Sequence, residues 1–172
     1  IRLLEIFSLP GIKNLNDFLN KKKNIKLENL NLITEDNNAD NLQFCPVIAG
    51  VNFLDQIKSL ENLSEIKFKN IAYPMLFLPF VSRASEVVGK RIFLRLDANE
   101  FLMNFNNNIS SNFSQKKIIK VAENVSIKIL ENEDSFNDNE WKELYKLSEE
   151  TFVEENESLK HSGAGAGLTD ND

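Results

Sequence analysis

Cysteine and histidine are almost absent from this sequence, since its 172 residues include only one of each. A structural zinc site needs four such ligands and an internal disulfide needs two cysteines, so both are excluded. A Ser–His–Asp triad would have to use His161, and nothing in the sequence places a serine beside that residue. Cys45 precedes Pro46 in an apolar run, so we expect a short buried strand over 45–51 and an inert, buried thiol.

Long apolar runs and a leader segment are also lacking. The longest apolar run, from Ile71 to Val81, includes two prolines and is shorter than the roughly 20 residues that span a bilayer. No secretory leader opens the sequence, so we expect a soluble, cytoplasmic protein without a membrane partner. Ile1 to Phe7 resembles the middle of a helix without an N-cap, which indicates truncation at the N-terminus.

Acidic side chains are in excess, but only in one part of the chain. The sequence carries 20 Lys+Arg and 26 Asp+Glu, a net charge of −6. Residues 1–130 hold 17 basic and 13 acidic side chains (+4), residues 131–172 hold 3 and 13 (−10), and the two sums give −6. An acidic protein is a poor match for the phosphate backbone, so we expect no nucleic-acid partner.

Hydrophobic periodicity predicts a single α+β domain over residues 1–160, followed by a glycine-rich tail at 161–172. Alternating apolar residues favour strands at 66–69, 91–96 and 118–130. We therefore expect an antiparallel or mixed sheet of four to five strands, packed by a central helix and a C-terminal helix.

The two expected packing helices have recognisable ends. Pro74 and Gly89 bound an apolar stripe typical of a buried central helix that kinks at Pro79. Asn137 and Glu140 form a capping-box pattern that begins the C-terminal helix, at about 138–155. Its inner stripe, which we expect to pack on the sheet, consists of Trp141, Leu144, Tyr145, Ser148 and Phe152.

The tail carries the least ordinary motif, with glycine at the alternate positions Gly163, Gly165 and Gly167. Its spacing is not the dinucleotide fingerprint, and no P-loop pattern occurs in the sequence. Asp170 and Asp172 follow, and carboxylates of this kind suit Mg²⁺ or Ca²⁺. A solvated chain end explains the same residues without any ligand, so we predict no metal site.

Three of the four arginines, Arg83, Arg91 and Arg95, fall within a short stretch. Arg91 and Arg95 share one face of a predicted strand, and arginine suits bidentate binding of a carboxylate or phosphate. Two interpretations stay open: a site for a small anion or for the acidic tail, and an exposed strand face paired with neighbouring acids.

Several segments together resemble a proteobacterial family known only as a domain of unknown function. They are Ile1-Arg2-Leu3-Leu4 running to Leu9-Pro10-Gly11, Cys45-Pro46-Val47-Ile48-Ala49-Gly50, Pro74-Met75-Leu76-Phe77-Leu78-Pro79-Phe80, Gly89-Lys90-Arg91 and the tail from Gly163 to Asp172. The resemblance implies a bacterial protein with a near-constant, ordered and functional tail, preceded by a further helical stretch at the N-terminus. It implies no reaction and no cofactor.

These observations favour a non-catalytic accessory or subunit protein of bacterial metabolism. Its tail (Gly163, Gly165, Gly167, Asp170 and Asp172) would dock into a partner protein or a neighbouring copy in a homo-oligomer. The alternative is an enzyme or binder of a small anionic metabolite, which would use Arg83, Arg91, Arg95 and the tail, with or without a divalent metal. We assign no catalytic residue and leave the cofactor unspecified.

Overall fold

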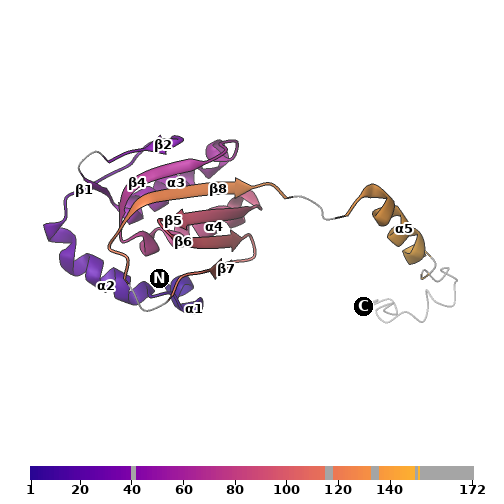
Figure 1. Cartoon of the computed structure of the whole chain (residues 1–172), viewed down its shortest axis with the longest axis horizontal. Helices are drawn as coiled ribbons and strands as arrows, with labels where there is room; N and C mark the ends of the chain where they lie inside the picture. The colour runs from indigo at the N-terminus through magenta and orange to yellow at the C-terminus, as the bar shows by residue number, and fades with distance from the viewer. Residues whose placement is uncertain (40–41, 115–117, 133–135, 150, 152–172) are drawn as a thin grey trace, which may run out of the picture. The chain divides into compact units, whose positions relative to one another are not determined.

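A computed structural model describes residues 1–39, 42–114, 118–132, 136–149 and 151 (Figure 1). The chain divides into two compact units, residues 1–132 and 133–172, and each is described by itself. The second unit contains the helix α5 (Asp138–Glu149). The elements of the first unit, in chain order, are α1 (Arg2–Ile6), α2 (Gly11–Lys21), the 3-10 turn η1 (Lys22–Asn24), β1 (Leu27–Glu28), β2 (Asp36–Asn37), β3 (Gln43–Phe44), α3 (Pro46–Leu60), β4 (Ile66–Ala72), the 3-10 turn η2 (Pro74–Leu76), α4 (Leu78–Val88), β5 (Arg91–Leu96), β6 (Asn99–Asn104), β7 (Asn108–Ser111) and β8 (Val121–Leu130).

One mixed sheet of eight strands forms the centre of the first unit, so the α+β class is confirmed and the expected four to five strands are too few. The strand order is β1-β3-β4-β8-β5-β6-β7, with β2 also paired to β4. β8 is central and runs antiparallel to both β4 and β5. The strands β1, β2 and β3 have two residues each, which is too short for a detectable alternating pattern.

The expected strand at 45–51 is wrong, because this segment begins the helix α3. Pro46 lies in the first turn of α3, where backbone N–H groups have no acceptor within the helix, so proline costs no hydrogen bond there. Cys45, the residue before it, has an extended backbone conformation. A short apolar run does not distinguish a buried strand from a buried helix, and here the proline was the better signal. Cys45 is buried, as expected.

The expected central helix at 74–89 is present in two pieces, η2 and α4. Pro79 lies in the first turn of α4 rather than in its interior, so the break falls where the proline ring is tolerated. Gly89 ends α4 in the left-handed conformation, with φ of 67°. Leu76 is buried, whereas Phe80 and Val88 are only half-buried.

The core lies between one face of the sheet and the helices α3 and α4, which stand behind the strands in Figure 1. Phe77 is fully buried at its centre, with its ring centroid 5.8 Å from that of Phe53 and 5.6 Å from that of Phe68. The two helices approach closely where Gly50 of α3 meets the Phe80 ring, since a Cβ on Gly50 would lie 2.3 Å from Phe80 Cδ2.

The capping box of α5 is confirmed, but the expected burial of its apolar stripe is not. The Asn137 backbone N–H donates to Glu140 Oε2 at 2.8 Å, and the Glu140 N–H donates to Asn137 Oδ1 at 3.1 Å. Within their own unit, Trp141, Leu144 and Tyr145 are each more than half exposed, so the packing of this stripe on the sheet stays a prediction. Helical periodicity identified which residues share a stripe, and it cannot identify what that stripe packs against. Phe152 lies outside the described residues.

Candidate functional site

The candidate site is the open face of the sheet, the side that faces away from α3 and α4. Successive side chains of β5 point to opposite faces of the sheet. Ile92, Leu94 and Leu96 are fully buried in the core. Arg91, Phe93 and Arg95 therefore lie on the open face. None of the helices described in residues 1–132 crosses this face (Figure 1). The arginines therefore lie on an accessible surface rather than in a closed pocket.

Cationic side chains dominate the open face. Strand register places cations on three neighbouring strands: Lys67 and Lys69 on β4, Lys128 on β8, and Arg91 and Arg95 on β5. Arg95 stands opposite Ser126, which in turn stands opposite Lys67, so the two cations lie on one row across β8. We call this set of five side chains the cationic rows.

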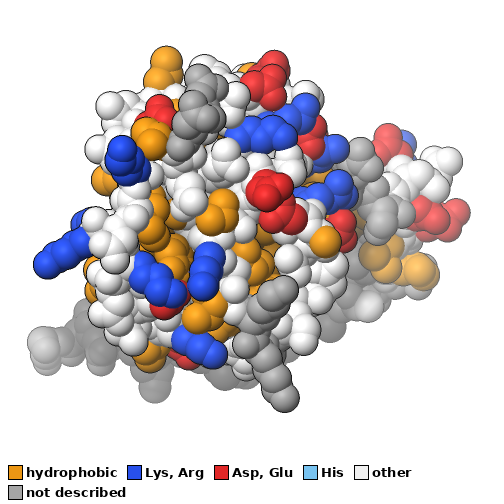
Figure 2. All heavy atoms as spheres, turned by 60° about the vertical axis from the view of Figure 1, so that its left-hand side comes forward, with side chains coloured by type: hydrophobic (Ala, Val, Ile, Leu, Met, Phe, Trp, Pro, Cys, Tyr) orange, Lys and Arg blue, Asp and Glu red, His pale blue; other side chains and the backbone are white. Residues whose placement is uncertain are grey.

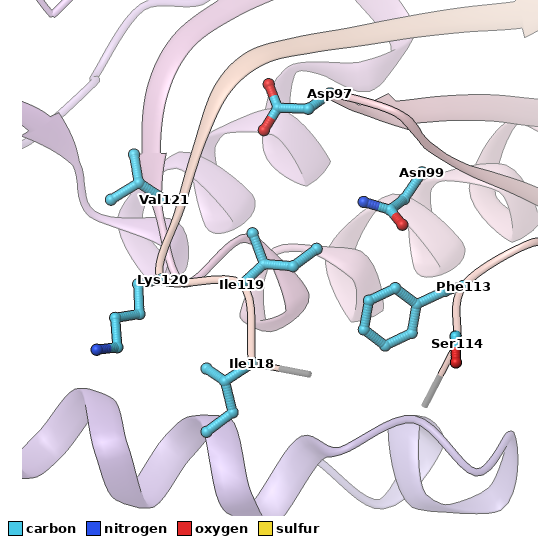
Figure 3. Close-up of a pocket in the computed structure, with 8 residues that line it drawn as sticks. All are labelled: Asp97, Asn99, Phe113, Ser114, Ile118, Ile119, Lys120 and Val121. Carbon is cyan, nitrogen blue, oxygen red and sulfur yellow. The ribbon is translucent and has the colours of Figure 1, made fainter. Parts of the chain in front are cut away.

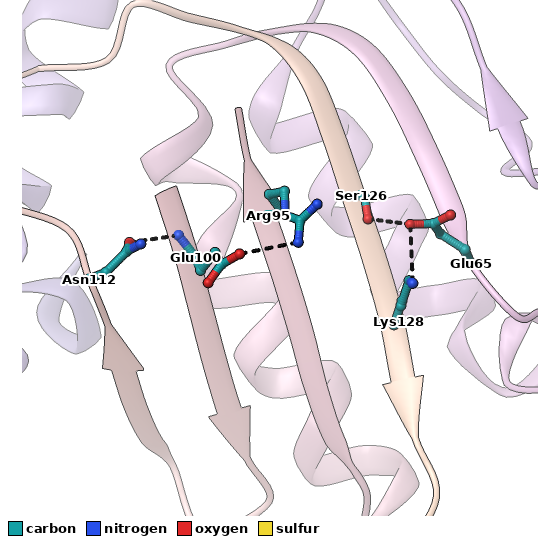
Figure 4. Close-up of polar contacts among 6 residues, drawn as sticks. All are labelled: Glu65, Arg95, Glu100, Asn112, Ser126 and Lys128. Atoms are coloured by element: carbon teal, nitrogen blue, oxygen red, sulfur yellow. Dashed lines mark hydrogen bonds and ion pairs between the residues drawn. The ribbon is translucent and has the colours of Figure 1, made fainter. Parts of the chain in front are cut away.

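Two carboxylates compensate part of this charge (Figure 4). Glu100 Oε1 lies 3.1 Å from Arg95 Nη2, and the Glu100 backbone N–H donates to Asn112 Oδ1 at 2.8 Å. Glu65 accepts a hydrogen bond of 2.6 Å from the Ser126 hydroxyl and also lies near Lys67 and Lys128. The Ser126 hydrogen bond is the main reason that the pKa of Glu65 is lowered.

An apolar pair lies at one edge of the cationic rows. Phe93 and Leu102 stand opposite each other on β5 and β6, and both are half-buried. The Arg95 guanidinium lies 5.8 Å from the centre of the Phe93 ring, within the range of a cation–π interaction. The open face thus offers apolar contact on β5 and β6 beside positive charge on β4, β8 and β5.

The structure brings together only two of the three predicted arginines. Arg91 and Arg95 share the open face, as their spacing predicted; Arg95 is paired with Glu100, and Arg91 makes no ion pair within the part of the chain that is described. Arg83 lies on α4, on the other side of the sheet, and pairs with Glu86 one turn away. The tail residues Gly163, Gly165, Gly167, Asp170 and Asp172 lie outside the described residues.

A hollow of about 790 Å³ opens at one end of the sheet, where no sequence pattern predicted one (Figure 3). The side chains of Phe113 and Ile119 face each other across it, while Lys120 turns away from Phe113. Asp97 accepts a hydrogen bond of 2.9 Å from the Asn124 backbone N–H, which occupies one carboxylate oxygen. No arginine lines this hollow among the described residues, so the expected anion pocket is not found here.

A polar cluster that sequence analysis missed joins α2 to the end of β4. The Tyr73 hydroxyl donates to Asp17 Oδ2 at 2.8 Å, and Lys21 Nζ lies 3.0 Å from Asp17 Oδ1. These two contacts, the tyrosine first, hold the pKa of Asp17 below its ordinary value. The contribution of the ionised Asp17 to stability is therefore present at neutral pH and is lost as the pH falls through this lowered pKa.

Tyr73→Phe is expected to lower the free energy of unfolding by about 1 kcal/mol, because it removes the hydrogen bond to Asp17 and leaves the ring in place. Urea unfolding followed by far-UV circular dichroism measures the change. Tyr145→Phe is the matched control, since Tyr145 is 56% exposed on α5. Equal effects of the two substitutions would mean that the hydrogen bond to Asp17 contributes nothing.

Within the described residues, no group of three or more His, Cys, Asp and Glu side chains is arranged to hold a metal ion. Across that same part of the chain, every helix is too short or too polar to cross a bilayer.

Comparison with known proteins gives one match. Residues 1–43 match the model of a protein family that is described as "Protein of unknown function (DUF3726)". The match supports the resemblance to an uncharacterised family over α1, α2 and the first two strands, and it brings no activity with it. No curated protein and no solved structure matches the chain.

Proposed function

We propose that the protein is a non-catalytic accessory or subunit protein that docks an acidic segment of another polypeptide chain on its open face. The observation that carries this proposal is the set of cationic rows on β4, β8 and β5 beside the apolar pair of Phe93 and Leu102. Complementary charge steers and orients a partner, while the half-buried apolar pair supplies contact area.

An extended acidic partner fits this surface better than a small anion does. The five cations spread over three strands, whereas a small anion is held where charged groups converge in a hollow. A hollow of about 370 Å³ does open on this face, between β5, β6 and β7, but its described lining includes Glu100 and no cation. Several separated carboxylates can meet several separated cations.

The partner can be a different protein or a neighbouring copy of this chain. Residues 131–172 carry 13 acidic and 3 basic side chains, a segment of the required charge. The more specific form of the proposal is that the tail, with Asp170 and Asp172, docks into the partner or the neighbouring copy. It rests on the sequence of the tail.

The test measures binding of a labelled acidic peptide to the full chain by fluorescence anisotropy. The probe is a synthetic peptide of residues 154–172, which carries five acidic side chains and one lysine. We expect saturable binding that weakens as salt rises, and a loss of at least about tenfold on combined Arg91→Glu and Arg95→Glu substitution.

Arg83→Glu is the matched control for Arg95→Glu measured alone, because Arg83 and Arg95 are similarly exposed, at 58% and 54%, and each pairs with one glutamate. A similar loss of binding in this control would contradict a site on the open face. The absence of saturable binding would contradict the docking of acidic segments altogether. Displacement of the peptide by phosphate, but not by chloride at equal ionic strength, would favour the small-anion alternative.

A further inference from the structure

An apolar hollow of about 410 Å³ lies between α2, β1 and the start of α3, away from the open face. The side of the molecule that includes α2 is shown in Figure 2, where apolar side chains are exposed between lysines and arginines. The apolar residues that line the hollow, besides Cys45, are Leu15, Phe18, Leu19, Leu27, Val47 and Ile48.

A second hollow borders the first. It has about 200 Å³, shares Leu15 and Val47 with the first in its lining, and is also lined by Leu76 and Phe80. Apolar lining residues thus extend from α2 and β1 to η2 and α4 on the helical side of the molecule. An extended apolar lining of this kind suits a chain-like apolar ligand.

The polar groups at the hollow are few, and only one of them is charged. Lys22 and Asn29 are the polar residues in its described lining. Lys21, the residue before Lys22, is already paired with Asp17, whereas Lys22 makes no ion pair within the described part of the chain. Ligand sites are typically apolar hollows of some hundreds of Å³ with a small number of polar groups that orient the ligand.

We propose that this hollow binds an aliphatic carboxylate, with the alkyl chain along Leu15, Phe18 and Val47 and the carboxylate at Lys22. The alkyl chain covers apolar surface that is otherwise exposed to water, and its burial supplies the affinity. The lysine ammonium fixes the direction in which the chain enters, because it is the only cation in the described lining. This site is independent of the docking proposed for the open face.

Isothermal titration calorimetry of the full chain with hexanoate, octanoate and decanoate tests the alkyl part of the proposal. Each added methylene that enters the hollow is expected to lower the Kd about fourfold. A Kd that does not change along the series, or no measurable binding of decanoate below its micelle-forming concentration, would overturn the proposal.

Substitution of Lys22 tests the carboxylate part. Lys22→Ala is expected to weaken octanoate binding about two- to fivefold and to leave octanol binding unchanged, because the alcohol has no charge to pair. Lys23→Ala is the matched control, since Lys23 is the next residue, is also exposed and does not line the hollow. Equal losses for Lys22→Ala and Lys23→Ala would show that the carboxylate senses only the general charge of this region.

Cys45 gives a second, independent readout, since it is the only cysteine of the chain and lines the hollow. Iodoacetamide is expected to alkylate it slowly in the free protein, because the side chain is buried. Saturating decanoate is expected to slow the alkylation further. The decanoate concentration that gives half of this protection should equal the Kd measured by calorimetry. Calorimetric binding of decanoate without any protection of Cys45 would place the ligand elsewhere and overturn the proposed site.

Discussion

Phe77→Ala is expected to remove about 3–5 kcal/mol from the free energy of unfolding, the usual range for a buried phenylalanine. Phe77 is fully buried, and its ring lies between Phe53 of α3 and Phe68 of β4, so the substitution leaves a cavity between the helical layer and the sheet. Domains of this size have a total stability of about 5–15 kcal/mol, so the loss is a large fraction of the whole. Urea unfolding followed by far-UV circular dichroism measures it.

Trp141→Ala is the matched control for this prediction, because it also removes a large aromatic side chain. Trp141 is 53% exposed, so its removal is expected to cost no more than about 0.5 kcal/mol. A loss at Trp141 as large as that at Phe77 would show that the stripe of α5 is buried after all.

Gly50→Val is expected to destabilise the protein by about 1–3 kcal/mol through overpacking between α3 and α4. The new Cβ would stand 2.3 Å from Phe80 Cδ2, far inside the contact distance of two carbon atoms. The Phe80 ring therefore has to move, or the two helices have to separate. The same urea unfolding experiment measures the difference.

A second substitution separates this clash from any general effect of replacing glycine. Gly50→Val is expected to cost much less in a Phe80→Ala chain than in the native chain, because the atoms that the valine meets are gone. Gly89→Ala is the control: its Cβ would meet no atom within 4 Å, and its cost comes from the φ of 67°. Gly89→Ala should therefore cost the same in both chains, and a smaller cost in the Phe80→Ala chain would contradict the explanation.

Sequence patterns predicted correctly those features whose controlling interactions are local. The Asn137–Glu140 capping box and the left-handed Gly89 both depend on residues within one helical turn. Arg91 and Arg95 lie on one face because a strand repeats every two residues, which their spacing alone determines. Arg83 was grouped with them by nearness in sequence, although the turn at Gly89 leads from a helix on one side of the sheet into the sheet itself.

The failures concern interactions between residues that are distant in the sequence. Tyr73 and Asp17 are 56 residues apart, so no periodic pattern could have paired them. The hollow beside Cys45 is lined by α2, β1 and α3, and it exists only once these elements are placed. What packs on a given apolar stripe is likewise a property of the whole fold, so the periodicity of α5 predicted its stripe and could not identify the surface that covers it.

The position of the single tryptophan has a consequence for spectroscopy. Trp141 is the only tryptophan of the chain, and it lies on the exposed helix α5 rather than in the sheet unit. Trp141 is 53% exposed and its ring lies 5.5 Å from that of Phe136, both outside the sheet unit, so the melting of the sheet should change its emission wavelength little. Tyr73, which is 1% exposed, is the native chromophore whose near-ultraviolet absorbance should follow that melting.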